Sequence, residues 1–147
     1  MDPIRVLLAE DVEILRRGLK AILSVFPDLR IAGEAGDGLE AVRLARELSP
    51  QVVLMDLSMP RMDGNEAIAE IKKSDPGIAI LALTASDETE KIRAALTAGA
   101  DGYLLKSVQA EELALAIRRV AAGGTYLTDD VAGLLSGSPS PSSPNAS

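Results

Sequence analysis

The chain contains no cysteine, no histidine and no tryptophan, and its only aromatic residues are two tyrosines and one phenylalanine. Without cysteine it can form no disulfide, no thiolate nucleophile and no zinc–thiolate site. Without histidine it cannot complete a Ser–His catalytic triad. These absences exclude hydrolases that depend on a cysteine or on a serine activated by histidine.

Basic residues and long apolar runs are also scarce. The chain has 15 Lys and Arg residues against 22 Asp and Glu residues, which gives a formal net charge of -7. This composition argues against direct binding of nucleic acid, which needs a basic face or stacking rings. No apolar run is long enough to span a bilayer, and no signal-peptide pattern follows Met1. We therefore predict a cytoplasmic protein that contacts no membrane and does not itself bind DNA.

Short apolar runs alternate along the chain with segments of helical period. Five strands are expected, at residues 4–9, 31–35, 52–55, 78–83 and 102–105. Their nearly continuous apolar composition is typical of strands that are buried on both faces of a sheet. Strict alternation of such strands with helices predicts an α/β fold, a doubly wound parallel sheet with helices on both faces.

The first two expected helices have clear sequence signals. The first carries one apolar stripe, made of Leu15, Leu19, Ile22 and Phe26. The second begins after Asp37, an expected N-cap, with Glu40 three residues later as the other half of a capping pair. This helix runs to Leu48 and must end before Pro50.

Three further helices are expected at residues 65–74, 87–98 and 108–122. Ser86 and Ser107 are their expected N-caps, and Gly99 is an expected C-terminal stop. A second apolar line on the first helix consists of Ile14, Gly18, Ala21 and Val25. Together with Leu115 on the last helix, this line is either a dimer face or part of a wide buried face. We expect burial.

The chain length suits one domain and is too short for two of ordinary size. We expect this domain to span residues 1–135 and to end in a short helix over 129–135, capped by Thr128. Residues 136–147 are rich in serine and proline, which predicts a flexible linker. We expect the chain to stop in this linker, without an output domain.

Acidic residues follow two of the expected strands. Glu10 and Asp11 come directly after the first strand, and Asp56 comes directly after the third. Neighbouring parallel strands share one crevice at their carboxyl ends, and three carboxylates clustered there need a proton or a cation. Mg²⁺ is the predicted ion, with Asp11 as a direct ligand, Glu10 as a direct or water-mediated one and the Ser58 backbone carbonyl as another. Alternatively, Asp11 caps the first helix.

Two more strand ends supply a hydroxyl group and an amine. Asp56 is the expected nucleophile, which would form an acyl phosphate. The hydroxyl of Thr84 can hydrogen-bond a phosphoryl oxygen, and Lys106 can pair with a carboxylate before the reaction and with the phosphoryl group after it. Each of these residues alone would be an ordinary strand-end residue. Their coincidence favours phosphoryl transfer to a carboxylate.

In order and spacing, these residues resemble the receiver domain of two-component response regulators, over residues 4–135. The matching positions are Glu10, Asp11, Asp56, Pro60, Asp63, Gly64, Thr84, Ala85, Tyr103 and Lys106. Residues 99–106, 111–113 and 123–127 are similar to the NarL/FixJ branch, whose receivers precede a LuxR-type helix-turn-helix DNA-binding domain. The resemblance implies a flavodoxin-like (βα)5 fold with strand order 2-1-3-4-5.

The resemblance also implies a function. A sensor histidine kinase would transfer a phosphoryl group to Asp56 and thereby control a transcription-regulating output domain that this chain lacks. Mg²⁺ would be held by Asp11, Asp56 and the Ser58 carbonyl, with Glu10 assisting. The protein would not be an enzyme beyond its own self-catalysed phosphoryl transfer and dephosphorylation.

Signalling would depend on residues around the phosphoryl group. Thr84 and Lys106 would bind it, and Tyr103 would swing inward as Thr84 moves. Tyr103 also has a simpler interpretation, as a half-buried aromatic residue on an edge strand. Ser58 and Ser86 lie where receivers tune the rate of dephosphorylation. A homodimer is the expected output of phosphorylation.

Two positions depart from the receiver pattern. Glu10 stands where many receivers have Asp, and its longer side chain should still reach a metal-bound water. Ser107 stands where many receivers have a proline after a cis peptide bond, and a cis bond without proline costs about 2.5–4 kcal/mol. We therefore expect a trans Lys106–Ser107 bond, or a strained cis one.

Two other functions fit these residues less well. A phosphohydrolase of the haloacid dehalogenase type needs a second Asp two residues after the nucleophile, where this chain has Ser58. A flavin-binding protein needs a hydroxyl-rich phosphate loop where this chain has Glu10 and Asp11, which repel phosphate. A stand-alone interaction module that acts without phosphorylation remains the alternative function.

Overall fold

A computed structural model describes residues 2–59, 62, 64–85 and 89–127. Five parallel strands form one sheet in the order β2-β1-β3-β4-β5, which confirms the predicted topology. The strands are β1 (Ile4–Ala9), β2 (Leu29–Ala35), β3 (Val52–Asp56), β4 (Ala79–Thr84) and β5 (Gly102–Leu105). The helices are α1 (Glu13–Ser24), α2 (Gly38–Leu48), α3 (Gly64–Ser74), α4 (Thr89–Ala98) and α5 (Ala110–Ala121).

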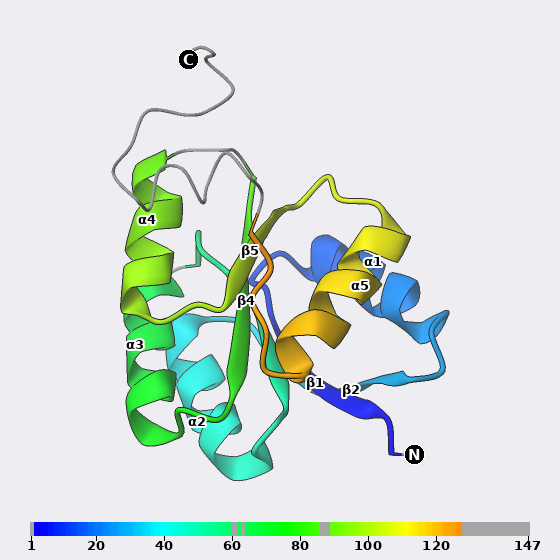
Figure 1. The fold of residues 1–147 in the computed structure, drawn as a ribbon, viewed down its shortest axis with the longest axis horizontal. Coiled ribbons are helices and arrows are strands. Elements are labelled where there is room, and N and C mark those ends of the chain that lie inside the picture. Colours follow the sequence, from blue (N-terminus) through cyan, green and yellow to red (C-terminus); the bar gives the residue numbers. More distant parts are fainter. Residues whose placement is uncertain (1, 60–61, 63, 86–88, 128–147) are drawn as a thin grey trace.

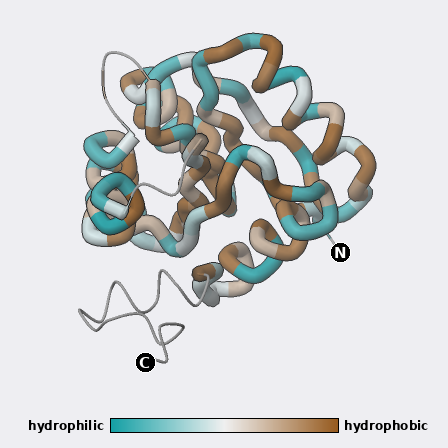
Figure 2. The backbone as a smooth tube through the Cα atoms, turned by 90° about the horizontal axis from the view of Figure 1, so that it is seen from above, coloured by the Kyte–Doolittle hydropathy of each residue, from teal (hydrophilic) through white to brown (hydrophobic). Residues whose placement is uncertain are grey.

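The helices cover both faces of the sheet (Figure 1), with α2, α3 and α4 on one face and α1 and α5 on the other. Side chains of a strand point alternately to its two faces, so each strand feeds both layers of the core. In β3, Val53 and Met55 pack toward α2, α3 and α4, whereas Val52 and Leu54 pack toward α1 and α5. Hydrophilic and hydrophobic segments alternate along the helices (Figure 2), as expected for helices that bury one face.

Several predicted helix ends are confirmed. The Asp37 side chain caps α2 by accepting a hydrogen bond from the Glu40 N–H at 2.8 Å, and α2 ends at Leu48 before Pro50. Gly99 follows α4 with a positive φ of 123°, and a Cβ atom there would lie 2.9 Å from the Lys72 side chain. Both the left-handed backbone and the close approach favour glycine at this position.

Other local predictions were wrong. Ser107 does not cap α5, because the Val108 N–H instead closes a turn onto the Leu105 carbonyl and the helix begins only after Gln109. The alternative weighed for Asp11, a cap on α1, is not observed, because the N-cap of α1 is Val12 and no side chain of the described residues caps this helix. The Asp11 carboxylate is therefore not committed to a helix cap.

The second apolar line on α1 is exposed, contrary to expectation. The side chains of Ile14 and Val25 are 77% and 72% exposed, and Leu115 on α5 is 46% exposed. Only one narrow stripe of α1 contacts the core, because Leu19, Ile22, Leu23 and Phe26 fill the space against the sheet and α5. Even Leu15, at the end of the predicted stripe, is 44% exposed.

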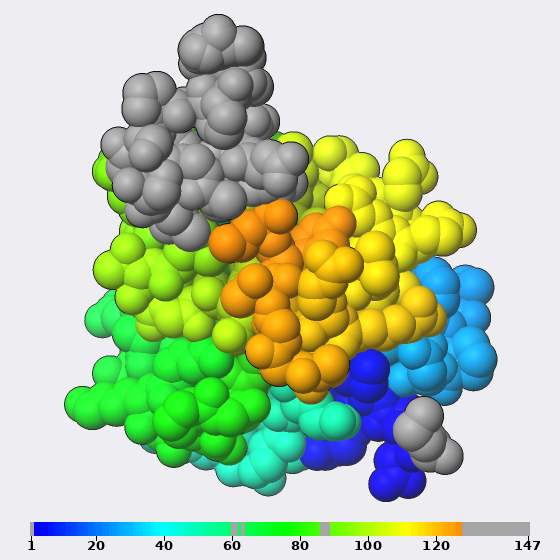
Figure 3. Space-filling view, viewed as in Figure 1, coloured from blue at the N-terminus to red at the C-terminus, as the bar shows by residue number. Residues whose placement is uncertain are grey.

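After α5 the chain returns to the sheet edge and lies on the surface beside α5 (Figure 3). Tyr126 forms a parallel bridge with Gly102 of β5, and the Tyr103 N–H donates to the Tyr126 carbonyl at 3.2 Å. Several predictions lie outside the described residues. They are the Pro60 and Asp63 motif positions, the Ser86 cap, the helix over 129–135 with its Thr128 cap, and the linker over 136–147.

Candidate functional site

The predicted site residues converge at the carboxyl edge of the sheet. Asp56 and Thr84 are the last residues of β3 and β4, while Glu10 and Lys106 directly follow β1 and β5. These four strands are adjacent and parallel, so their ends meet at the crevice where open α/β sheets place their ligands. The Lys106 N–H donates to the Thr84 carbonyl at 2.8 Å, which ties the last two strand ends together.

Three carboxylates form a tight cluster at this edge. One oxygen from each of Glu10, Asp11 and Asp56 lies within 4.8 Å of the other two. Glu10 is 0% exposed and Asp56 is 1% exposed, and within the described chain Asp56 Oδ2 accepts no hydrogen bond. Buried carboxylate oxygens without partners are costly unless a cation compensates them. The donor set therefore fits a hard divalent cation that prefers oxygen ligands.

The Lys106 ammonium group compensates part of this negative charge. Its Nζ lies 3.1 Å from Asp56 Oδ1 and 3.2 Å from Glu10 Oε1. Burial lowers the pKa of Lys106, but pairing first with Asp56 and then with Glu10 outweighs burial and leaves the pKa raised. Lys106 therefore carries its charge at neutral pH, between the two buried acids.

The pKa of Glu10 is raised above its usual value, chiefly by burial. The hydrogen bond from the Val12 N–H lowers this pKa, while the charge of Asp56 raises it. A nearby cation stabilises the charged form of a carboxyl group that is buried in this way. The shift thus has the direction expected of a buried acid that belongs to a cluster of carboxylates.

Asp56 is held by the loop that follows it. The Ser58 N–H donates to Asp56 Oδ1 at 3.0 Å, and the Leu57 N–H donates to the Leu83 carbonyl at 3.0 Å. Asp56 Oδ1 therefore has both Ser58 and Lys106 as neighbours. This arrangement fixes the plane of the carboxylate and leaves Oδ2 without a hydrogen bond from the described chain.

Thr84 and Tyr103 are both buried, at 2% and 6% exposure. Tyr103 packs in the core layer that contains Ile92 and Ala95 of α4. Tyr103 is thus more deeply buried than the simpler interpretation, a half-buried aromatic residue, expected.

The described residues contain no cis peptide bond, so the Lys106–Ser107 bond is trans.

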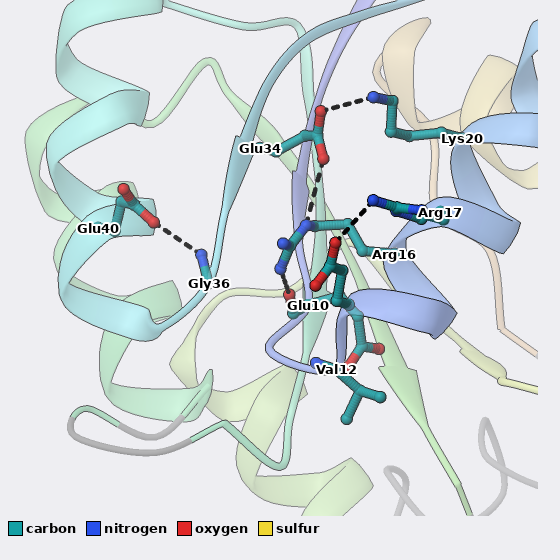
Figure 4. A network of polar contacts seen from close by, with 9 residues as sticks. Glu10, Val12, Arg16, Arg17, Lys20, Glu34, Gly36 and Glu40 are labelled. Carbon is teal, nitrogen blue, oxygen red and sulfur yellow. Dashed lines mark hydrogen bonds and ion pairs between the residues drawn. The ribbon is translucent and has the colours of Figure 1, made fainter.

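Sequence reasoning missed one residue beside the site, Arg16. Its Nη1 donates to the Glu10 backbone carbonyl at 2.7 Å, and its Nε pairs with Glu34 on β2 at 3.2 Å (Figure 4). No spacing pattern signals this contact, because Glu34 lies 18 positions from Arg16 and on a different kind of element. Only the packing of α1 beside β2 brings the two side chains together.

Comparisons with known proteins identify relatives over most of the chain. The family profile of the response regulator receiver domain matches residues 6–118. The transcriptional regulatory protein LiaR of Bacillus subtilis is 49% identical over 132 residues, covering 88% of this chain and 62% of LiaR. The response regulator protein VraR of Staphylococcus aureus is 41% identical over 128 residues, covering 87% of this chain and 61% of VraR.

Solved structures show the same fold. A LuxR-family two-component response regulator from Aurantimonas sp. SI85-9A1 superposes with a TM-score of 0.84 at 34% identity, covering 92% of this chain and 97% of the other. The receiver domain of the putative response regulator NarL from Mycobacterium tuberculosis gives 0.81 at 32% identity, with 84% and 99% covered.

The chain spans 62% and 61% of the lengths of LiaR and VraR. Within the described part of the chain, no helix has the length and apolar character needed to cross a membrane. Family profile, relatives and superposed structures agree over the same region as the site. The chain belongs to the receiver domain family of two-component response regulators, of the NarL/LuxR type.

Proposed function

We propose that Asp56 accepts a phosphoryl group from the phosphohistidine of a sensor histidine kinase. The observation that carries this proposal is the buried Asp56 carboxylate, grouped with Glu10 and Asp11 and paired with Lys106 at 3.1 Å. In the reaction an Asp56 oxygen forms a bond to phosphorus while the phosphorus–nitrogen bond breaks. The electron pair of that bond returns to the leaving imidazole, and the product is an acyl phosphate.

The acidic cluster would hold Mg²⁺ through Asp11, Asp56 and the Ser58 carbonyl, with Glu10 assisting. When bound, Mg²⁺ supplies charge neutralisation, which lets the phosphate oxygens approach the carboxylates. Asp56 Oδ2 has no hydrogen-bond partner in the described chain, and one lysine faces three clustered carboxylates, which supports a cation at this place. Mg²⁺ is preferred over softer metals because every available ligand is an oxygen atom.

Thr84 and Lys106 would bind the transferred group. Lys106 starts between Glu10 and Asp56, and it would exchange part of this pairing for a phosphoryl oxygen. Thr84 would donate its hydroxyl to another phosphoryl oxygen. Tyr103 is buried in the described conformation, and we propose that phosphorylation favours this inward position as Thr84 moves.

A receiver domain is not a classical enzyme, and we propose that this one catalyses only its own phosphorylation and dephosphorylation. Hydrolysis would return Asp56 to the carboxylate, with Ser58 and Ser86 as the positions that set its rate. The alternative function, an interaction module that works without phosphorylation, predicts no dependence of binding on Asp56 chemistry.

The proposed output is control of transcription through a DNA-binding helix-turn-helix domain that is not part of residues 1–147. Residues 1–135 would form the receiver domain, and residues 136–147 would form the linker. We also propose a homodimer, supported by the exposed apolar side chains of Ile14 on α1, Val25 directly after α1 and Leu115 on α5. The cytoplasmic location expected from the sequence stays a prediction.

The test is intact mass spectrometry after incubation with acetyl phosphate. We expect one phosphoryl adduct on the wild type in Mg²⁺, none in EDTA and none on Asp56→Asn. Asp2→Asn is the matched control, since Asp2 is exposed and lies outside the acidic cluster. An adduct of equal yield on Asp56→Asn would refute the proposal. No adduct on the wild type under conditions where Mg²⁺ binds would favour the alternative function.

A further inference from the structure

Arg16 lies on α1, one turn after the acidic loop, and its side chain turns back toward that loop (Figure 4). Its Nη1 donates to the Glu10 carbonyl at 2.7 Å, and its Nε pairs with Glu34 Oε1 at 3.2 Å. One planar guanidinium group thus joins the end of β1 to β2. The fixed fork of arginine suits such a bridge better than a single ammonium group does.

The far end of this bridge is itself anchored. Glu34 Oε2 pairs with Lys20 Nζ at 2.8 Å, so two cations of α1 hold one carboxylate of β2. The pKa of Glu34 is lowered, first by the hydrogen bond from Lys20 against the opposing effect of burial, and then by Arg16. Glu34 is therefore a charged partner for Arg16 at neutral pH.

The end of the bridge that lies at the acidic cluster is Glu10, the residue before Asp11. Three other contacts restrain Glu10. Its N–H donates to the Ala35 carbonyl at 3.0 Å, its Oε2 accepts the Val12 N–H at 3.1 Å and its Oε1 faces Lys106. The Glu10 carbonyl itself points to Arg16. Without Arg16, the peptide that joins Glu10 to Asp11 would lose its hydrogen bond to a side chain.

Arg16 donates its hydrogen bond to the backbone carbonyl of Glu10, whereas the acidic cluster is made of the side-chain carboxylates of Glu10, Asp11 and Asp56. Its charge is compensated by Glu34, which limits the repulsion it exerts on a cation in the cluster. Its effect on a bound cation is therefore expected to come from geometry, in the way that outer hydrogen bonds orient metal ligands.

We infer that Arg16 is a positioning residue, which together with Glu34 holds the Glu10–Asp11 loop in the geometry that binds Mg²⁺. This inference rests on the proposed function of the acidic cluster. It adds a structural requirement that lies outside the cluster itself. The requirement is a bridge from α1 to β2 across the end of β1.

The test is Mg²⁺ titration calorimetry on Arg16→Met, which keeps the apolar stem and removes the donors. Loss of such an outer hydrogen bond weakens metal binding by about tenfold or more, so we expect the Mg²⁺ dissociation constant to rise by about tenfold. Arg17→Met is the matched control, because Arg17 is the neighbouring residue, its side chain is 76% exposed and it pairs with Glu13. We expect Arg17→Met to bind Mg²⁺ as the wild type does.

Two further variants keep the inference testable if Arg16→Met does not fold. Arg16→Lys retains the charge but cannot span both partners, and Glu34→Gln removes the anchoring charge. Both should weaken Mg²⁺ binding, and raising Mg²⁺ should restore the rate of phosphorylation by acetyl phosphate. An unchanged dissociation constant in every folded variant would overturn the inference.

The inference and the proposed function can fail separately. A wild type that binds Mg²⁺ but forms no acyl phosphate would refute the function, while the effect of Arg16 on Mg²⁺ affinity would still be measured. A wild type that is phosphorylated, with Arg16 variants of normal Mg²⁺ affinity, would refute only the role of Arg16. A wild type that binds no Mg²⁺ would overturn both.

Discussion

Replacing Lys106 by methionine should destabilise the protein in a way that depends on pH and on Mg²⁺. Methionine keeps the length and the apolar part of the side chain and removes the ammonium group. In the wild type this group lies 3.2 Å from Glu10 and 3.1 Å from Asp56, whose side chains are 0% and 1% exposed. The variant would leave two buried carboxylates facing each other without their shared cation.

The magnitude follows from the burial of the partners. Removing one member of a buried ion pair costs about 3–5 kcal/mol, because it leaves an uncompensated buried charge. The Lys106 side chain is 23% exposed, so water already screens part of the interaction. We therefore expect a loss near the lower limit, about 3 kcal/mol, at neutral pH without Mg²⁺.

The pH dependence has a definite sign. The folded-state pKa of Glu10 is already raised, chiefly by burial, and Lys106 is one of the groups that lower it. A raised pKa means that the contribution of Glu10 to stability is present below its unfolded pKa of 4.5 and is lost as the pH rises through the folded value. Without Lys106 the pKa of Glu10 rises further, so the variant should lose more stability at pH ~7.5 than at pH ~5.

The assay is urea unfolding followed by circular dichroism, in EDTA and in Mg²⁺ at both pH values. Lys73→Met is the control, because Lys73 is exposed on α3. Mg²⁺ should restore much of the stability of Lys106→Met, since a bound cation neutralises the same carboxylates. If the loss in EDTA at neutral pH is below about 1 kcal/mol, the value of an ordinary surface pair, then Lys106 does not neutralise this cluster.

Three further predictions test other parts of the molecule. Mg²⁺ about 100-fold above its dissociation constant should stabilise the wild type by about 2.7 kcal/mol, and thermal unfolding of Asp11→Asn should show a smaller shift. Gly64→Ala should destabilise the protein by about 1–3 kcal/mol in urea unfolding, because a Cβ there would lie 2.7 Å from Leu57 Cα and 2.8 Å from the Asp56 carbonyl. Ile14→Glu should abolish dimer formation by the phosphorylated protein in light scattering while changing unfolding stability by no more than about 0.5 kcal/mol, since Ile14 is 77% exposed. An unaltered dimer would place the interface elsewhere.

The fold could be predicted because each strand carries a local signal. Residues 4–9, apart from Arg5, and residues 102–105 are apolar runs, and their observed limits match the prediction. Helix ends were less predictable, since a cap depends on the turn before it. Ser107 has the right chemistry for a cap, but the Val108 turn delays α5 by two residues. The exposure of Ile14 could not be predicted either, because apolar periodicity does not reveal how wide a stripe of the helix the sheet can cover.

The candidate site followed from topology more than from any one residue. Glu10, Asp56, Thr84 and Lys106 lie far apart in the sequence, and a parallel sheet brings their strand ends to one edge. The bridge from Arg16 to Glu34 has no such rule behind it. It depends on the reach of one long side chain between a helix and a strand, which sequence spacing does not specify.

The central claim, that Asp56 carries the phosphoryl group as an acyl phosphate, is tested most directly by locating the modified residue. The wild type would be phosphorylated with acetyl phosphate and Mg²⁺, treated with hydroxylamine and digested for peptide mass spectrometry. Hydroxylamine cleaves acyl phosphates and leaves a hydroxamate on the carboxyl group. We predict a hydroxamate on Asp56 and on no other residue. A phosphoryl group that resists hydroxylamine, or a modification at another acid, would contradict the claim.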